Sequence, residues 1–476
     1  TFLKRFKDSR LCPEAMYQLG IAFYALNQPE KAESALRALL KQYPEHYIAP
    51  TALYQIAIMC FAREDFSQMT TVMEELISRY PDNRLVPDAY FWLGWLAKKN
   101  SEYDNAITAF RKCLETDPSN PRAPESLFSV AQSLNEKATK MGLPTILPDE
   151  QRTVYRSLIL DAAQAFENIL VQYPDSTQAL DAVPGIADNI YNLVRYRQFN
   201  EQEALDYFSK AFAGYRDDPQ VSAQLAFAQG SYYIKNNQKD KALAAFNRSF
   251  SISSDVHLSP SLLSEYAEAL KSANQLSKAE DVYKKIIANY PDDARALAPA
   301  WFGLANIKYS QNNFEEARKL FEKVLKEYKW YDKGKEGRVM LAKVLERSKQ
   351  YEKAEKMFEE VWKQETGSAR IGAMLGVARC QLAQARIAKK QHMALPWRKN
   401  IQVADKNLTK IIVLFEAYPE YVAEALWLKG NAYELVEDRQ NARKTYSRLV
   451  LEYKNYPPAK LAAERLKKLG GILSPE

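Results

Sequence analysis

Small and large apolar residues recur along the chain at fixed distances from one another. A Gly or Ala is followed by Ala twelve positions later, and by a large apolar residue four positions after that. Three copies continue to a Pro after eight more residues: Gly20, Ala32, Leu36 and Pro44; Gly94, Ala106, Phe110 and Pro118; Ala267, Ala279, Tyr283 and Pro291. Four copies lack the Pro: Gly230, Ala242 and Phe246; Ala305, Ala317 and Phe321; Ala342, Ala354 and Phe358; Gly430, Ala442 and Tyr446. Self-similarity of this kind predicts a stack of similar structural units.

The spacing has a physical explanation in two antiparallel helices. A Gly or Ala lets the two helices approach closely, and the Ala twelve positions later faces it across the hairpin. The large residue one turn further on fills the gap against the next hairpin. The closing Pro lacks an amide hydrogen and ends the second helix. The sequence therefore predicts helices from Gly20 to Ala442 and no strand.

The closing prolines also define the length of the repeat. Pro44, Pro81 and Pro118 are separated by 37 residues, against about 34 in the standard tetratricopeptide repeat. Several second helices end on a Tyr-Pro pair: Tyr43-Pro44, Tyr80-Pro81, Tyr173-Pro174, Tyr290-Pro291 and Tyr418-Pro419.

These features resemble the tetratricopeptide repeat over nearly the whole chain. The resemblance implies an all-α fold: a right-handed α-α superhelix of about eleven helical hairpins, closed by a capping helix over Leu461 to Leu469. The longer repeat with its Tyr-Pro ending more closely resembles the repeat proteins of the bacterial cell envelope. These include the outer-membrane lipoprotein BamD of the barrel-assembly machine and the Tol–Pal-associated coordinator proteins. The chain differs from both in length and has no lipobox or coiled-coil segment.

Two long interruptions divide the repeat array. Between Ala131 and Pro174 the frame is about nineteen residues longer, with the excess around Met141 to Pro148, and Lys389 to Asn400 interrupts a hairpin. We expect both insertions to form functional loops. The expected organisation is residues 1–138 for three hairpins and the first helix of the fourth, 139–152 for a Pro-flanked insertion, 153–388 for the central array, 389–400 for a basic insertion, 401–469 for the last hairpins and capping helix, and 470–476 for a tail.

Composition agrees with a repeat array. The 476 residues are 47% hydrophobic and 12% aromatic, with only 15 Gly. A repeat array can form one continuous body at this length. No apolar run approaches the ~18–20 residues that span a bilayer, so we expect a soluble body. The chain begins at Thr1 without a charged or apolar leader, and we expect any targeting segment to have been removed.

Residues for catalysis or metal binding do not occur together. His46, His257 and His392 lie in different repeats or loops, and none has a partner at metal-ligand spacing. There is no phosphate-binding loop and no nucleophile elbow. The four cysteines show no CxxC spacing, and we expect buried thiols. We therefore expect no enzyme, no catalytic residue, no metal, no cofactor and no small-molecule substrate.

Aromatic residues recur in the first helix of several repeats. In the repeat family this helix lines the inner groove, so the resemblance implies that some of these rings face a partner. The rings either pack between hairpins or form a stripe that binds an apolar or extended peptide. The N-terminal candidates for this stripe are Tyr17, Tyr24, Tyr54, Phe61, Phe91 and Trp95. Leu19, Ile56 and Leu93 are expected at the neighbouring core-facing positions. The Lys and Asn set with which chaperone-binding relatives hold a C-terminal carboxylate is absent.

Positive charge is concentrated late in the chain. Residues 301–400 carry 22 Lys and Arg against 12 Asp and Glu, whereas the net charge of the whole chain is +7. The excess is either a solvated helix face or a docking surface, and nucleic acid is not expected because acidic residues are interleaved. The candidates for a docking patch are Lys329, Trp330, Lys333, Lys335, Lys389, Lys390, Trp397 and Arg398.

The sequence therefore predicts a non-enzymatic scaffold for protein–protein interaction within a multiprotein complex. The resemblance implies the bacterial cell envelope, with secretion, outer-membrane assembly, pilus or motility machinery as settings. It implies a periplasmic or outer-membrane-associated location, with membrane contact only through a removed lipid anchor. Two alternatives stay open: a cytoplasmic adaptor subunit of the same fold, and a regulatory sensor that binds a signalling peptide.

Overall fold

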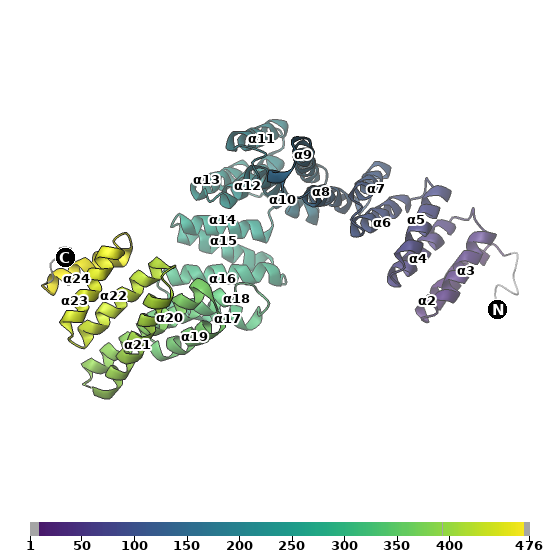
Figure 1. The fold of residues 1–476 in the computed structure, drawn as a ribbon. Helices are drawn as coiled ribbons and strands as arrows, with labels where there is room; N and C mark the ends of the chain where they lie inside the picture. Colours follow the sequence, from purple (N-terminus) through teal and green to yellow (C-terminus); the bar gives the residue numbers. More distant parts are fainter. Residues whose placement is uncertain (1–8, 393, 471–476) are drawn as a thin grey trace. The chain divides into compact units, whose positions relative to one another are not determined.

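Helices form nearly all the regular structure of the computed structural model, which describes residues 9–392 and 394–470 (Figure 1). This part of the chain contains no strand. Helices α2 to α23 pair as eleven successive hairpins, and α24 follows as a single helix. The predictions of an all-α fold and of about eleven hairpins are confirmed. The last helix, α24, covers Pro457–Lys468, where a capping helix was expected over Leu461 to Leu469. The predicted tail, 470–476, lies outside the described residues except for Gly470.

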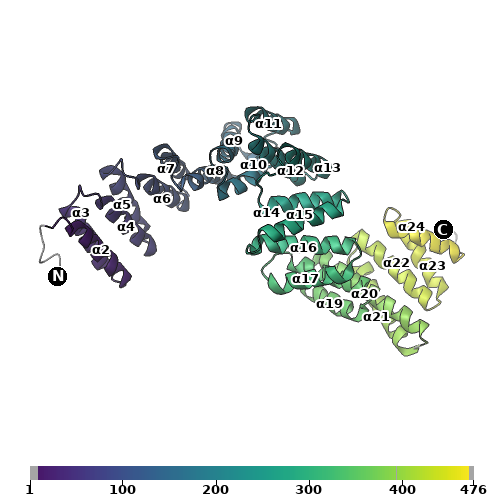
Figure 2. The ribbon, with the colours of Figure 1, turned by 180° about the vertical axis from the view of Figure 1, so that it is seen from behind.

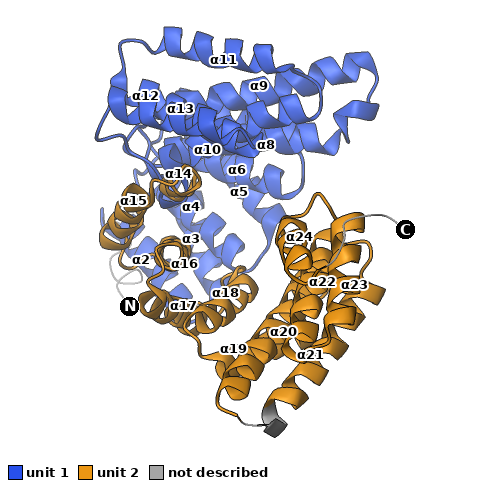
Figure 3. Ribbon diagram, turned by 90° about the vertical axis from the view of Figure 1, so that its left-hand side faces the viewer, with its two compact units in different colours: residues 1–262 blue, residues 263–476 orange. Residues whose placement is uncertain are grey.

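The chain divides into two units, residues 1–262 and 263–476, coloured separately in Figure 3. In each unit successive hairpins lie beside one another (Figure 1, Figure 2). The first unit contains α2 (Cys12–Ala25), α3 (Pro29–Gln42), α4 (Ala49–Ala62), α5 (Phe66–Arg79), α6 (Val86–Lys99), α7 (Tyr103–Thr116), α8 (Ala123–Lys140), the short 3-10 helix η1 (Pro144–Ile146), α9 (Asp149–Gln172), α10 (Thr177–Arg195), α11 (Glu201–Gly214), α12 (Pro219–Lys235) and α13 (Lys239–Ile252).

The boundary between the units falls inside α14 (Pro260–Ser272). The second unit continues with α15 (Leu276–Asn289), α16 (Ala294–Ser310), α17 (Phe314–Glu327), α18 (Gly334–Arg347), α19 (Tyr351–Gln364), α20 (Gly367–Lys390), α21 (Ala394–Leu414), α22 (Pro419–Leu435), α23 (Arg439–Glu452) and α24 (Pro457–Lys468).

A second series of prolines, separate from the closing ones, starts the first helices of the N-terminal hairpins. Pro13, Pro50, Pro87 and Pro124 occupy the first turns of α2, α4, α6 and α8. An amide hydrogen is not needed at this position, and the fixed φ of Pro suits the helix. The 37-residue spacing of these prolines therefore marks where each first helix begins.

Glycines of the first helices lie under large side chains of the second helices. A Cβ on Gly94 would lie 2.8 Å from Cδ1 of Phe110, and one on Gly430 would lie 2.2 Å from Cε1 of Tyr446. Each large residue thus fills the space over the glycine of its own hairpin. Tyr283 instead lies against Gly303 of the following hairpin, at 2.2 Å from the position of such a Cβ. The predicted role against the next hairpin therefore covers only part of the packing.

The tyrosine that ends a second helix connects neighbouring hairpins. The Tyr80 hydroxyl donates to the carbonyl of Pro44 at 2.7 Å, and the Tyr173 hydroxyl donates to the carbonyl of Pro118 at 3.0 Å. Each bond reaches back to the proline that closes an earlier repeat. The Tyr-Pro pair thus has a structural function: the tyrosine hydroxyl links the end of a hairpin's second helix to the connection that precedes the same hairpin.

The first insertion is only partly a loop. Helix α8 ends at Lys140 and α9 begins at Asp149, so much of the excess lengthens α9 to 24 residues. Between them, η1 buries Pro144, whereas Leu143 and Ile146 are 55% and 78% exposed. The connection therefore presents two large apolar side chains to solvent.

The second insertion, 389–400, is mostly helical. Helix α20 continues to Lys390 and α21 begins at Ala394, so the expectation of a long loop is wrong. Pro396 falls in the first turn of α21, where a missing amide hydrogen costs no intrahelical bond. The extra residues lengthen both helices of one hairpin.

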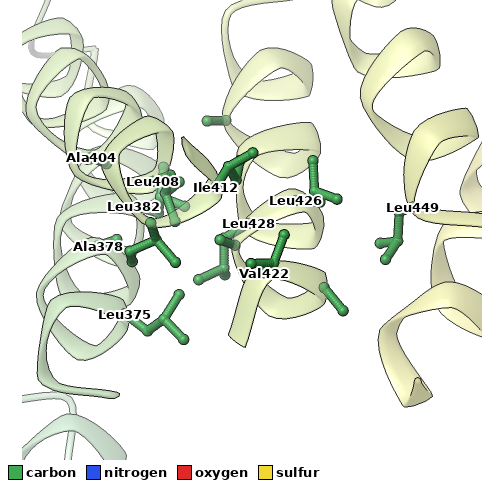
Figure 4. Packing of buried hydrophobic residues seen from close by; sticks show 14 of the residues in the cluster. Leu375, Ala378, Leu382, Ala404, Leu408, Ile412, Val422, Leu426, Leu428 and Leu449 are labelled. Carbon is green, nitrogen blue, oxygen red and sulfur yellow. The ribbon is translucent and has the colours of Figure 1, made fainter. Parts of the chain in front are cut away.

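The long α20–α21 hairpin belongs to the apolar core of the second unit. Leu382 of α20 and Leu408 of α21 are buried together with Leu426 of α22 (Figure 4). Burial of large aliphatic side chains is the main stabilising term in such a core. Each hairpin therefore depends on its neighbours for stability.

Candidate protein-binding surface

Five partly exposed rings gather on the N-terminal hairpins. We call this group the aromatic cluster: Tyr54 and Phe61 of α4, Phe66 of α5, and Trp92 and Trp95 of α6. The Phe61 ring centre lies 5.1 Å from that of Trp92 and 5.5 Å from that of Trp95. The Phe66 ring centre lies 6.1 Å from that of Trp95. Offset and edge-to-face rings at such distances attract one another.

The side of the cluster towards the start of α6 is held by polar contacts. The indole N–H of Trp92 donates to the Tyr54 hydroxyl at 3.1 Å. The Arg122 guanidinium lies 5.1 Å from the Trp92 ring centre and 3.5 Å from an Asp88 carboxylate oxygen. Burial raises the pKa of Asp88, and the charge of Arg122 acts against this rise. These contacts fix the Trp92 ring before any partner binds.

The side towards the end of α6 carries a lysine. The Lys99 ammonium lies 3.7 Å from the Phe66 ring centre and 5.3 Å from that of Trp95. Such cation–π contacts stabilise by ~0.5–1 kcal/mol at exposed sites. The neighbouring Lys98 turns to α8, where it bonds the Gln132 side chain at 2.5 Å.

The predicted stripe is only partly brought together. Tyr54, Phe61 and Trp95 join the aromatic cluster, but Phe91 is 2% exposed and packs against Phe110, so its predicted place in the groove is wrong. Tyr17 and Tyr24 lie partly buried on α2. Neither makes a ring contact with the cluster in the part of the chain that the structure describes. Binding by these residues stays a prediction.

Trp92 and Phe66 were missed by the sequence reasoning. Trp92, Trp95 and Lys99 are spaced at i, i+3 and i+7, which places them on one face of α6. That spacing could have identified Trp92. Phe66 lies in the second helix, outside the positions considered.

The expectation that Leu19 faces the core is wrong. Leu19 is 39% exposed, whereas Ile56, one repeat later, is fully buried. The described residues include no hairpin before α2 that could cover Leu19. A solenoid residue on this face is buried only where a neighbouring hairpin packs on it.

The basic candidates form two groups instead of one patch. The first, Lys329, Trp330, Lys333 and Lys335, lies at the connection between α17 and α18, where Lys335 pairs with Glu365 at 3.5 Å. The second, Lys389, Lys390, Trp397 and Arg398, lies at the turn between α20 and α21. The first group is at the start of a first helix and the second at the end of one. The two groups therefore lie at opposite ends of the first helices, and α18 alone, with 14 residues, is about 20 Å long.

Family models match several parts of the chain. A tetratricopeptide-repeat model matches residues 14–46 and 424–456, and another matches residues 87–120. The C-terminal ARM domain model of tetratricopeptide repeat protein 21 matches residues 214–379. The chain is a tetratricopeptide-repeat protein. Repeats of this type imply a scaffold for protein interaction, and the fold is typically non-enzymatic.

Solved structures similar to this tetratricopeptide-repeat protein share little sequence with it. Yeast Tom70 is 13% identical at a TM-score of 0.34, covering 96% of this chain and 95% of that chain. The Cut9–Hcn1 hetero-tetramer of the APC/C is 12% identical at 0.38, covering 98% of both chains. The C-terminal part of a repeat protein from Cytophaga hutchinsonii is 17% identical at 0.40, covering 58% of this chain and 97% of that chain. No curated protein matches the sequence.

Three further features of this tetratricopeptide-repeat protein concern metal binding, membrane-spanning helices and the cysteine thiols. Among residues 9–392 and 394–470, no three His, Cys, Asp or Glu side chains are grouped so that they could hold a metal ion. In the same residues, no helix combines the length and apolar character needed to cross a membrane. All four cysteines are buried as expected, and burial raises the pKa of the Cys60 and Cys113 thiols. Raised thiol pKa values reduce reactivity.

Proposed function

We propose that the chain is a scaffold that binds an extended segment of a partner protein at the aromatic cluster of α4, α5 and α6. In this proposal the partner belongs to a multiprotein assembly of the bacterial cell envelope.

The observation that carries this proposal is the partial exposure of five adjoining rings. Exposed apolar surface that is contiguous, unlike single exposed residues, is typical of interaction sites. Binding energy in protein interfaces concentrates in a few Trp, Tyr and Arg side chains. The cluster supplies Trp and Tyr, Arg122 lies beside Trp92, and the bond between Trp92 and Tyr54 already orders two of the rings.

A variant pair tests this binding surface. Tyr54→Ala together with Trp95→Ala removes two of the five rings, and we expect partner capture from the native source to be lost. Tyr90→Ala is the matched control, because Tyr90 lies on the same helix but its ring faces Lys112, at 5.5 Å, instead of the cluster. Circular dichroism checks that helicity is unchanged. Capture of the same partner by wild type and double variant would contradict the proposal.

The envelope setting is supported by the repeat type alone. The 37-residue period and the Tyr-Pro endings resemble the envelope subfamily. Fractionation of native cells tests the setting, and we expect the protein with the periplasm or outer membrane. Recovery in the cytoplasm would favour the adaptor alternative and leave the binding surface unaffected.

The two basic groups are proposed as secondary contacts. Trp330 is 57% exposed beside Lys329 and Lys333, a combination that suits an acidic partner surface. Lys389 offers less, because it already bonds the Leu435 carbonyl at 2.7 Å and Glu437 at 2.9 Å.

A further inference from the structure

We propose that Lys99 and the rings beside it form a subsite for an acidic side chain that neighbours an apolar side chain in the bound segment. This inference rests on the proposed function, because it assigns the chemistry of the segment that the aromatic cluster binds. Lys99 would then determine specificity, and the rings would supply most of the affinity.

The first argument is that the charge of Lys99 is not neutralised. In the described residues no carboxylate lies within ion-pair distance of its ammonium group, and its side chain is exposed. The other cations at the cluster are already paired: Lys98 with Glu136 at 3.4 Å, and Arg122 with Asp88 at 3.5 Å. Lys99 therefore has a charge available for a partner carboxylate.

The second argument concerns the rings. Lys99 lies over Phe66 and Trp95, and Arg122 lies over Trp92. Two cations of the protein therefore already lie on the negative faces of these rings, and a cationic ligand would meet like charge there. An apolar side chain can still pack on the exposed parts of Phe61 and Trp95 without this penalty.

The third argument selects a single carboxylate over a polyanion. The two hairpins that build the cluster, residues 49–116, contain seven Lys and Arg against nine Asp and Glu. Glu64 and Asp65 lie in the turn just before Phe66, and Glu102 lies three residues after Lys99. A chain of phosphates would meet these carboxylates, so a nucleic acid is disfavoured. A single acidic side chain brings only one negative charge to this surface, so it meets less repulsion from these carboxylates than a chain of phosphates does.

A pair of synthetic peptides tests the subsite on the full chain. The first is an end-blocked nonapeptide with the centre Leu-Phe-Glu-Leu between Gly and Ser residues, and the second has Gln in place of Glu. We expect calorimetry to show roughly threefold to fivefold tighter binding of the Glu peptide, the range of one exposed ion pair. Lys99→Met should remove this preference and leave the affinity for the Gln peptide unchanged. Lys99→Arg should keep the preference.

Lys112→Met is the matched control. Lys112 also lies over a ring, that of Tyr90 at 5.5 Å, but this ring is not one of the five in the aromatic cluster. Removal of the Lys112 charge should therefore leave the preference intact. Equal binding of both peptides, binding of neither, a preference that survives in Lys99→Met, or tighter binding of an oligothymidylate than of the Glu peptide would each overturn the inference.

The failure of this inference can be told apart from failure of the proposed function. If partner capture is lost in the double variant Tyr54→Ala and Trp95→Ala but is unaffected by Lys99→Met, the aromatic surface binds and the acidic subsite is wrong. If capture is unaffected by both, the proposed function fails as well.

Discussion

Single glycines set how closely the two helices of a hairpin approach. Gly430 has no room for a Cβ, because Tyr446 covers it and is itself held by a bond from its hydroxyl to Glu434 at 2.7 Å. We expect Gly430→Ala to destabilise by about 1–3 kcal/mol, the usual cost of overpacking. The measurement is the midpoint of chemical unfolding.

Gly334→Ala is the control for this change. Nothing lies within 4 Å of the position that its Cβ would take, and Ala favours helix over Gly. We expect an equal or slightly higher midpoint. Equal destabilisation by both substitutions would show that backbone conformation, instead of packing, explains the glycines.

A buried ion network in the second unit should make stability depend on pH. Glu280 accepts from Lys308 and lies beside Lys284, both at 2.7 Å, and accepts from Gln311 at 3.2 Å. Burial raises the pKa of Glu280, but the bonds from the lysines and Gln311 outweigh burial and lower it to about 2, from 4.5. A lowered carboxyl pKa stabilises the fold above the unfolded value, and this contribution is lost as the pH falls through the folded value.

The test is Glu280→Gln. We expect a lower melting temperature than wild type at pH 7, with a difference that shrinks between pH 4.5 and pH 2. Glu322→Gln is the control. Glu322 is half exposed, and its carboxylate is as far as 3.9 Å from Arg318. Such surface ion pairs contribute little to stability. A difference for Glu280→Gln that stays constant across this pH range would refute the role of its charge.

At the scale of helices and turns, each hairpin uses one left-handed residue between its two helices. Most of these are not glycine: Asn27, Glu64, Ser101, Arg197, Asn237, Asn274, Asn312, Lys349, His392 and Glu437 all have φ between 57° and 65°. The ten lie in the turns between first and second helices. Asn adopts this conformation more readily than long side chains such as Lys do.

Lys349→Gly should therefore stabilise the protein. Lys349 has φ 61°, a conformation that costs a non-Gly residue roughly 1–2 kcal/mol. The greater unfolded-state entropy of Gly offsets part of this gain, so we expect about 0.5–1 kcal/mol in thermal or chemical unfolding. Asn312→Gly, at the same φ, should give less. A loss of stability for Lys349→Gly would mean that its side chain has a structural contact worth more than the strain.

The elements were largely predictable because the repeat relies on local rules. Small residues and closing prolines located the hairpins, since each marks a position where close approach or a missing amide hydrogen is required. The rings of the binding surface were less predictable. Phe91 and Trp92 are adjacent in sequence, yet one is buried against Phe110 and the other is partly exposed. Which of two adjacent rings faces solvent depends on the rotation of α6 against α4 and α7, which the composition of α6 does not determine.

At the scale of the whole chain, departures from the repeat differ in structure even where they look similar in sequence. Most described residues of the insertion at 389–400 belong to α20 and α21, whereas the insertion at 139–152 kept a connection between Lys140 and Asp149. Both contain Pro, but Pro396 falls in the first turn of a helix and Pro144 starts η1 after an extended residue. Pro144 and Pro396 both lie in the first turn of a helix, so the presence of a Pro alone does not distinguish the two insertions in the sequence.

The connection between α8 and α9 should be dispensable for folding and required for a partner. Replacing residues 142–147 by Gly and Ser removes Leu143 and Ile146, which are largely exposed and contribute little burial. The packing of α8 on α9 should persist through buried residues such as Leu134 and Ile159. We therefore expect a melting temperature within a few degrees of wild type and weaker capture of the native partner, because exposed apolar residues on a long connection favour a binding role.

The paired change Leu143→Ser and Ile146→Ser keeps the buried Pro144 and serves as the control. Weakened capture in both variants would assign the contact to the two side chains, whereas melting of the array in the Gly-Ser variant alone would show that η1 is part of the core.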